Sequence, residues 1–168
     1  KVLKTIRNYE MLKACDTVLV AVSGGADSVF LLQALVHLKT KLRLKILIVC
    51  NLDHGIRGKE SKEDSLFVKK MAEGMDLGFI HKRIDLSKKK SNKLSTEELA
   101  REERYRFFQD AAKAAKAGVI ATGHTLDDQA ETILMRIIKG ASLKGIVGIS
   151  PVREEGSLKI IRPLFELE

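Results

Sequence analysis

The chain has 168 residues, 45% of them hydrophobic and 31% charged, which is enough for one domain with a buried core. No apolar run is long enough to cross a bilayer, and residues 1–13 lack the apolar segment of a signal peptide, so we expect a cytoplasmic protein with no membrane partner. The net charge of +8 favours a polyanionic partner such as nucleic acid, although such a charge also serves solubility.

Apolar residues follow the strand period and the helix period in alternation along the chain. In chain order the pattern predicts a strand at 17–22, a helix at 27–38, a strand at 45–51, a helix at about 59–75, a strand at 77–84, a helix from 95 to about 116, a strand at 119–122, a helix at 126–138 and a strand at 158–161. This alternation predicts an α/β fold, with a mostly parallel five-stranded sheet and helices on both faces. No Pro/Gly/Ser-rich linker divides the chain, so residues 1–168 are expected to form a single domain.

Three polar segments follow predicted strands at the point where each strand ends. They are SGGADS at 23–28, NLDHGIRG at 51–58 and GHTLDDQAET at 123–132. Ligands of such sheets bind outside the carboxyl ends of the strands. We therefore expect the three segments to line one ligand site.

The SGGADS segment has the residue types of a phosphate-binding turn. Gly24 and Gly25 allow positive φ and inward N–H groups, and the helix that follows adds unpaired N–H groups and the positive end of its dipole. Ser23 and Ser28 carry hydroxyls that can donate to phosphate oxygens, and Asp27 fits a Mg2+ ion that bridges the phosphates. A plain turn, with Asp27 as helix N-cap, is the alternative, and the two other polar strand ends disfavour it.

The segment contains no lysine, which separates it from two familiar nucleotide loops. The chain has neither GxxxxGK[ST], whose lysine follows the β and γ phosphates during γ transfer, nor the GxGxxG fingerprint. Instead, VAVSGGADS at 20–28 resembles the PP-loop of the N-type ATP pyrophosphatases. The resemblance implies cleavage of ATP between the α and β phosphates and adenylation of a substrate.

Three further segments narrow the resemblance. LDHGIRG at 52–58, ELAREERYRF at 98–107 and ATGHTLDDQAETILMRIIKGASLKGIVGI at 121–149 resemble the tRNA(Ile)-lysidine synthetases, in order and over nearly the whole chain. The resemblance implies a Rossmann-like fold of the adenine nucleotide alpha hydrolase type, with the first strand central, and a homodimer. It also implies that ATP, Mg2+, free L-lysine and the anticodon of tRNA(Ile) take part. The family carries further C-terminal tRNA-binding domains, which we expect to be absent from this chain because it ends at Glu168.

The reaction implied by the resemblance has two steps. The C2 carbonyl oxygen of the wobble cytidine attacks the α-phosphate and pyrophosphate departs, after which the ε-amine of lysine displaces AMP at C2. The activation barrier arises mainly from negative charge on the phosphate and on the departing pyrophosphate. N–H groups, Mg2+ and arginines can stabilise that charge. SGGADS would then hold the β and γ phosphates as the leaving group, which accounts for the missing lysine.

The resemblance assigns roles to individual residues. It implies catalytic roles for Asp128, Arg104, His124 and Arg101. It also implies that Asp128 and Glu131 bind the amine of lysine. Nucleotide contacts fall to Ser23, Gly24, Gly25, Ala26, Asp27, Ser28, Asp53, His54, Arg57 and Gly123, with Asp27 also holding Mg2+.

Several of these side chains could instead have a purely structural or surface role. Adjacent Asp127 and Asp128 point about 100° apart on a helix, so at most one faces the site, and the other would stabilise the helix N-terminus. Arg101 and Arg104 share a helix face and suit an α-phosphate or tRNA backbone, but surface pairs with Glu97 or Glu98 are the alternative, and the preferred one for the nearby arginine at 106. A structural role for the histidine at 124 also stays open. The basic segment 87–94 either contacts tRNA or is a solvated charge run.

The two cysteines help to distinguish lysidine synthesis from tRNA thiolation. Cys15 and Cys50 form no CxxC pair, and Cys50 falls in an apolar strand, where a buried structural thiol is expected. A PP-loop tRNA thiolase would need an accessible reactive cysteine, so 2-thiolation is the second choice. An ATP-binding module without its own activity is the non-enzymatic alternative.

Overall fold

The computed structural model describes residues 1–53, 55, 59–86, 95–142 and 146–168. The predicted nucleotide contacts His54 and Arg57 and the basic segment 87–94 therefore lie outside the described residues. Within the described ranges, no helix combines the length and the apolar character that crossing a membrane requires.

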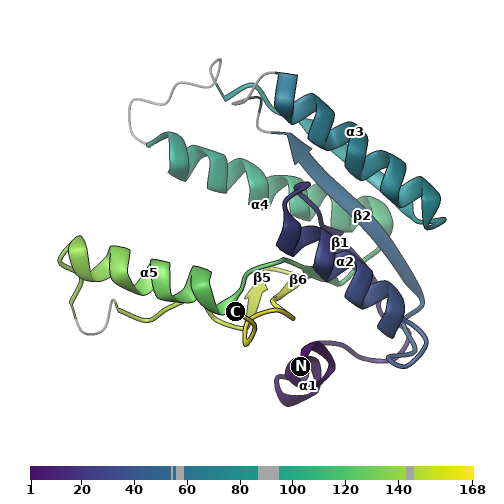
Figure 1. Ribbon diagram of the computed structural model, residues 1–168, viewed down its shortest axis with the longest axis horizontal. Helices are drawn as coiled ribbons and strands as arrows, with labels where there is room; N and C mark the ends of the chain where they lie inside the picture. Colours follow the sequence, from purple (N-terminus) through teal and green to yellow (C-terminus); the bar gives the residue numbers. More distant parts are fainter. Residues whose placement is uncertain (54, 56–58, 87–94, 143–145) are drawn as a thin grey trace.

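Five helices and six strands alternate along the described chain (Figure 1). They are α1 (Val2–Asn8), β1 (Thr17–Ala21), α2 (Ala26–Leu38), β2 (Ile46–Asp53), α3 (Lys59–Gly74), β3 (Gly78–Arg83), α4 (Thr96–Ala115), β4 (Val119–Ala121), α5 (Leu126–Ile138), β5 (Val152–Glu155) and β6 (Leu158–Ile161). The sheet order is β3-β2-β1-β4-β6-β5, so β1 lies inside the sheet as expected. All neighbouring strands are parallel except β5, which runs antiparallel to β6.

The prediction of five strands was wrong by one, because β5 was missed. Its sequence, VREE, is polar and half exposed, so it carries no apolar strand pattern. A tight turn through Gly156, with φ of +64°, returns the chain and pairs β5 with β6. The turn, and not the hydrophobic pattern, therefore specifies this edge strand.

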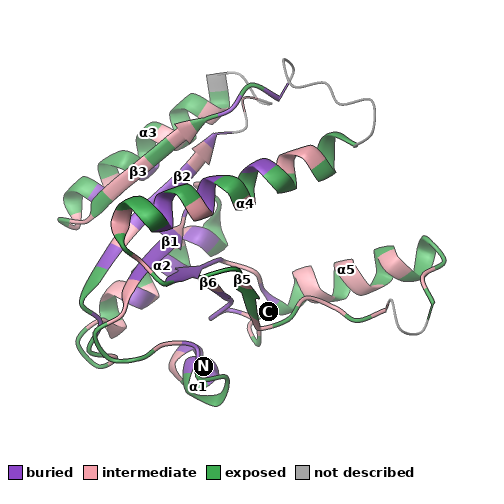
Figure 2. Ribbon diagram, turned by 180° about the vertical axis from the view of Figure 1, so that it is seen from behind, coloured by how far each residue is buried: buried purple, intermediate pink, exposed green. Residues whose placement is uncertain are grey.

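Two layers of helices bury opposite faces of the sheet. Alternate residues of β1 point to opposite faces, so Val18 and Val20 pack with the buried leucines of α2, while Leu19 packs with Phe107 and Phe108 of α4. Figures 1 and 2 show α2 and α3 on one face and α4 on the other. This double burial explains why the central strands are apolar throughout.

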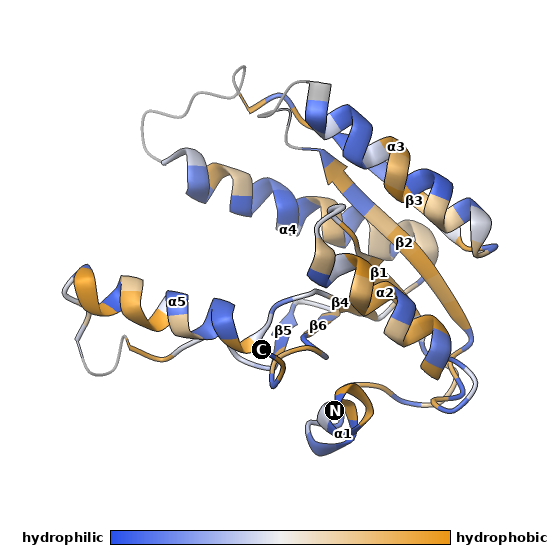
Figure 3. Ribbon diagram, viewed as in Figure 1, coloured by the Kyte–Doolittle hydropathy of each residue, from blue (hydrophilic) through white to orange (hydrophobic). Residues whose placement is uncertain are grey.

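Helix α5 extends away from the sheet instead of covering it (Figure 1). It has no buried residue, and Ile138 is 83% exposed. Figure 3 shows that apolar residues recur along this helix. The backbone N–H of Leu126 donates to the carbonyl of Leu167 at 2.7 Å, which fixes the first turn. The helix therefore projects from the carboxyl edge of the sheet and forms a wall there.

Candidate active site

A cavity of about 690 Å³ opens at the carboxyl ends of β1, β2, β4 and β6, a size typical of small-molecule sites, which span about 300–1,000 Å³. Helices α4 and α5 and residues 148–150 close its sides. The sequence-predicted residues that line it are Ser23, Gly25, Asp27, Ser28, Arg101, Arg104, Gly123, His124, Asp128 and Glu131. Parallel strands thus bring SGGADS and GHTLDDQAET to one cavity, whereas NLDHGIRG contributes only Leu52 among its described residues.

The loop between β1 and α2 is held in shape by its own hydroxyls. Ser28 Oγ accepts from the backbone N–H of Ser23 at 3.2 Å and donates to the carbonyl of Gly25 at 2.8 Å. Gly24 has φ of +101°, and a Cβ there would approach Asp64 of α3 to 3.2 Å. The Ser28 hydrogen is used inside the loop, and so are the N–H groups of Ser23 and Gly25, the latter bonded to Ser23 Oγ at 3.4 Å. Donors for an anion therefore come from the N–H groups of the first turn of α2.

The N-terminus of α2 faces the same cavity. Its N-cap, Gly25, provides no side-chain hydrogen bond, so the first-turn N–H groups and the positive end of the dipole are available to an anion. Asp27 and Ser28 of this first turn line the cavity, whereas Gly24 and Ala26 do not. In the part of the chain that the structure describes, no group of three or more His, Cys, Asp or Glu could hold a metal. Asp27 is thus a carboxylate at the anion site that belongs to no such group.

Two residues from neighbouring strands fix the position of this loop. Gly123, after β4, packs so closely that a Cβ would lie 3.1 Å from the Ser28 nitrogen. The buried Asn51 of β2 donates through Nδ2 to the Val22 carbonyl at 2.8 Å, and its Oδ1 lies 3.0 Å from Nδ1 of His81. Sequence reasoning did not assign Asn51 a role, although an amide at the end of an apolar strand was the available signal.

His124 is neutral at physiological pH. Its Nδ1 lies 3.0 Å from Oγ1 of Thr122. Burial and the nearby charge of Arg162 lower the pKa of His124 to about 4, and the carboxylate of Asp128 opposes that shift. The imidazole can accept a proton or a hydrogen bond here, but it holds no proton to donate as imidazolium at pH 7.

Arginines form the wall opposite the loop. The Tyr105 ring lies between the guanidinium groups of Arg101 and Arg153, at 5.1 and 5.2 Å from its centroid. Desolvation lowers the pKa of Arg104 and of Arg162, and both stay cationic at neutral pH. Sequence reasoning assigned no role to Arg153 or Arg162, even though Arg162 directly follows an apolar strand.

Acidic side chains of α5 form the third wall. Asp128 lines the cavity and Asp127 does not, so one of the adjacent pair faces the site. Oδ2 of Asp128 accepts from the backbone N–H of Thr125 at 2.8 Å and from its hydroxyl at 3.3 Å, which completes a capping box. Glu131, one turn further along α5, lines the cavity beside it. The capping box therefore fixes the side chain of Asp128, which the resemblance implies to be catalytic and to bind the lysine amine.

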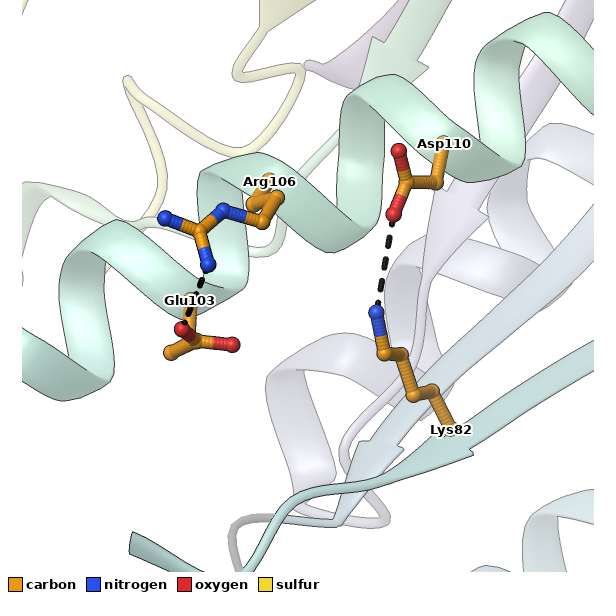
Figure 4. Close-up of polar contacts among 4 residues, drawn as sticks. All are labelled: Lys82, Glu103, Arg106 and Asp110. Atoms are coloured by element: carbon orange, nitrogen blue, oxygen red, sulfur yellow. Dashed lines mark hydrogen bonds and ion pairs between the residues drawn. The ribbon is translucent and has the colours of Figure 1, made fainter. Parts of the chain in front are cut away.

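Two predicted polar residues lie elsewhere. Asp53 is buried, accepts from the Gly55 N–H at 2.7 Å and pairs with Arg83 at 3.4 Å, and it is not among the residues that line the cavity. Its carboxylate therefore stabilises the β2 end, because a buried charge needs such partners. Arg106 pairs with Glu103 at 3.0 Å, not with either glutamate that the sequence suggested, while Lys82 and Asp110 join β3 to α4 nearby (Figure 4).

The two cysteines lie at opposite ends of the sheet. Cys50 lines the cavity but is 1% exposed, and burial raises the pKa of its thiol to about 12. Cys15 is exposed and precedes β1, whose far end carries the loop. Cys50 is therefore buried and protonated at neutral pH, and Cys15 lies away from the cavity, so neither is placed as a reactive cysteine there.

Comparison with known proteins gives a consistent result for family and fold. The model of the PP-loop domain matches residues 1–168. The chain is 44% identical to the tRNA(Ile)-lysidine synthase of Clostridium acetobutylicum, over 99% of this chain and 35% of that protein. It is 42% identical to the same-named protein of Clostridioides difficile, over 100% of this chain and 36% of the relative. The chain thus spans about a third of the length of these relatives.

A solved structure shares the fold. The U34-tRNA thiolase NcsA from Methanococcus maripaludis with its [4Fe-4S] cluster superposes with a TM-score of 0.76 and 20% identity, over 99% of this chain and 58% of that one. At this identity the likeness supports the Rossmann-like architecture alone.

Proposed function

The chain belongs to the PP-loop domain family, and on that premise we propose that it binds ATP at the SGGADS loop and modifies tRNA(Ile). The names of its curated relatives support this substrate. The C2 carbonyl oxygen of the wobble cytidine attacks the α-phosphorus, and the bond from that phosphorus to the β-phosphate oxygen breaks to release pyrophosphate. The ε-amine of free L-lysine then attacks C2, AMP leaves with the former carbonyl oxygen, and the nitrogen loses its proton.

The single observation that carries this proposal is the pairing of two anion-binding walls in one cavity. The loop and the uncapped N-terminus of α2 form one wall, and Arg101 and Arg104 on α4 form the other. A nucleotide with its β and γ phosphates on the loop would present its α-phosphate to these arginines. Fixed donors on both sides stabilise the charge that develops as pyrophosphate leaves.

Asp27 fits a magnesium ion shared with the phosphates, since Mg2+ is usually held by one or two carboxylates together with substrate phosphates. When bound, the ion would neutralise charge on the departing pyrophosphate. The exposed carboxylate of Asp27 lies in the first turn of α2, at the cavity. Without a cation, this carboxylate would repel the phosphates that the first-turn N–H groups of α2 attract.

The remaining polar side chains suit the second substrate. Asp128 and Glu131 provide negative charge for an ammonium group of lysine from the α5 wall. The neutral imidazole of His124 can accept a hydrogen bond from the nucleotide or from the amine. The net charge of +8 and the arginine wall favour a tRNA backbone at the mouth of the cavity. The homodimer implied by the resemblance stays a prediction.

A tRNA thiolase is the second candidate, because the PP-loop fold also occurs in NcsA. The thiol of Cys50 has a pKa raised to about 12 and is buried, so at pH 7 it is protonated and a poor sulfur nucleophile. The other cysteine lies beyond the opposite end of β1. These positions favour lysine over sulfur as the second nucleophile.

Turnover of radiolabelled ATP tests the proposal. The chain is incubated with ATP labelled at the α-phosphate, Mg2+, unmodified tRNA(Ile) and either lysine, other amines or sulfide, with the Clostridium acetobutylicum relative as positive control. We expect AMP release that requires both tRNA and lysine, and that survives Cys50→Ser. Release that depends on sulfide, or that needs no tRNA, would replace the proposed function with thiolation or with simple ATP hydrolysis.

A further inference from the structure

Arg162 is a buried cation on the wall of the cavity. It directly follows β6, is 4% exposed and lines the same cavity as the loop. Its Nη1 donates to the carbonyl of Ser150, and its backbone N–H donates to the carbonyl of Pro151 at 3.0 Å. Its Nε has no hydrogen-bond acceptor among the residues that the structure describes.

A buried guanidinium N–H without an acceptor is rare in folded proteins, because leaving it unpaired costs free energy. Desolvation lowers the pKa of Arg162, and the charges of Arg153 and Arg101 lower it further, while the Tyr105 side chain opposes that shift. The hydrogen bond from Nη1 to the Ser150 carbonyl nevertheless holds the guanidinium group of Arg162 in place. An anion accepted by Nε would both satisfy the donor and relieve the repulsion from the other two arginines.

The place of Arg162 in the sheet separates it from the phosphate loop. The loop follows β1, and β4 lies between β1 and β6. Neighbouring strands are about 4.8 Å apart, so the backbone of Arg162 stands about 10 Å from the strand that carries the loop. The backbone of Arg162 therefore lies outside the phosphate loop, although both line the same cavity.

The carboxylates that share the cavity with Arg162 indicate which anion fits, since the charges of both Arg162 and Asp128 act on His124. Asp128 and Glu131 line the same cavity from α5, which follows the adjacent β4. Both capping bonds of Asp128 use Oδ2, so the cap does not use Oδ1. A phosphate group here would meet two carboxylates, whereas a zwitterionic amino acid carries one group for the cation and others for the acids.

We propose that Arg162 binds the α-carboxylate of the free amino acid substrate, while Asp128 and Glu131 face its ammonium groups. This inference rests on the proposed function, which supplies lysine as that substrate. It makes Arg162 a specificity residue, because an amine without the carboxylate would lack its partner.

Calorimetric titration of related amines tests the assignment directly. Lysine, lysinamide and cadaverine are titrated into the wild-type chain, Arg162→Gln and Arg162→Lys, each with Mg2+ and a non-hydrolysable ATP analogue. We expect wild type to bind lysine about 10- to 100-fold more tightly than lysinamide, the range for one charge-assisted hydrogen-bonded pair. Arg162→Gln should bring lysine to the level of lysinamide, and Arg162→Lys should keep part of the preference.

A matched variant controls for the loss of charge. Arg7→Gln removes the same charge from an exposed position on α1, which does not line the cavity, and should keep the ratio of lysine to lysinamide affinity. Circular dichroism and the affinity for the ATP analogue show whether each variant is folded. If Arg162→Gln does not fold, equal binding of lysine and lysinamide by wild type still overturns the role of Arg162, and Arg162→Lys still tests it.

Each contrary result has its own meaning. Equal binding of lysine and lysinamide by wild type, or an unchanged preference in Arg162→Gln, overturns the role of Arg162 and leaves the proposed function in place. Weaker binding of the ATP analogue with an intact lysine preference makes Arg162 a phosphate ligand and overturns the assignment. If wild type binds no amine of the series, lysine as substrate fails together with this inference.

Discussion

Acidification should destabilise the folded chain through His124. The ordinary pKa of 6.5 falls to about 4 in the folded protein, because burial and the charge of Arg162 disfavour the imidazolium. Between these values the unfolded chain binds a proton that the folded chain does not, so the contribution is complete above pH 6.5 and is lost as the pH falls towards 4. A shift of 2.5 pKa units, at about 1.36 kcal/mol each, corresponds to about 3 kcal/mol.

Urea unfolding of wild type and His124→Gln at several pH values isolates this contribution. Other groups that titrate in this range are common to both proteins, so the difference between the two free energies of unfolding reports His124. We expect the wild type to lose about 3 kcal/mol more than the variant between pH 6.5 and 4. Parallel pH profiles, or an imidazole that titrates near 6.5 by NMR, would refute the reasoning.

Three substitutions test the loop and the arginine wall. Asp27→Ala should abolish Mg2+-dependent ATP use while leaving the urea midpoint unchanged, because the side chain is exposed; turnover equal to wild type would remove its metal role. Gly123→Ala places a Cβ 3.1 Å from the backbone nitrogen of Ser28 and should cost about 1–3 kcal/mol of stability and weaken ATP binding, both measured by titration. Gly118→Ala, with nothing within 4 Å of its Cβ, is its control, and equal effects would contradict the close-approach argument. Arg104→Ala should slow adenylation more than it weakens ATP binding in single-turnover kinetics, whereas an equal loss of both would make it a ground-state contact.

The parallel core of this fold was predictable because its strands are apolar on both faces. Val18, Leu19 and Val20 are all fully buried. A short, continuous apolar run that is bounded by turn residues is typical of such a buried strand. Strand β5 gave no such signal, since three of its four residues are charged and none of the four is buried. Its pairing follows from the turn at Gly156, which hydrophobic periodicity does not register.

The site was predictable where function depends on the ends of apolar strands. SGGADS and Asp128 reach the cavity because β1 and β4 are neighbours. The polar strand ends indicated a shared site, but the sequence itself did not supply the strand order. Arg153 enters the cavity only through the unpredicted hairpin, so the sequence could not place it. For Asp53 the motif suggested a ligand contact that the structure does not show. Its buried carboxylate instead contacts Arg83 and accepts a hydrogen bond from the backbone.

The projection of α5 has a consequence for amide hydrogen exchange. None of the residues of α5 is buried, so packing contributes little to keeping this helix folded, and a helix of 13 residues is marginal by itself in water. The capping box and the Leu126–Leu167 bond stabilise only its first turn. Amides beyond that turn should exchange through local opening, far faster than those of α2, whose Leu31 and Leu35 are fully buried. The acidic wall of the cavity thus belongs to the least protected helix, and a bound amine that holds it in place would register as slower exchange.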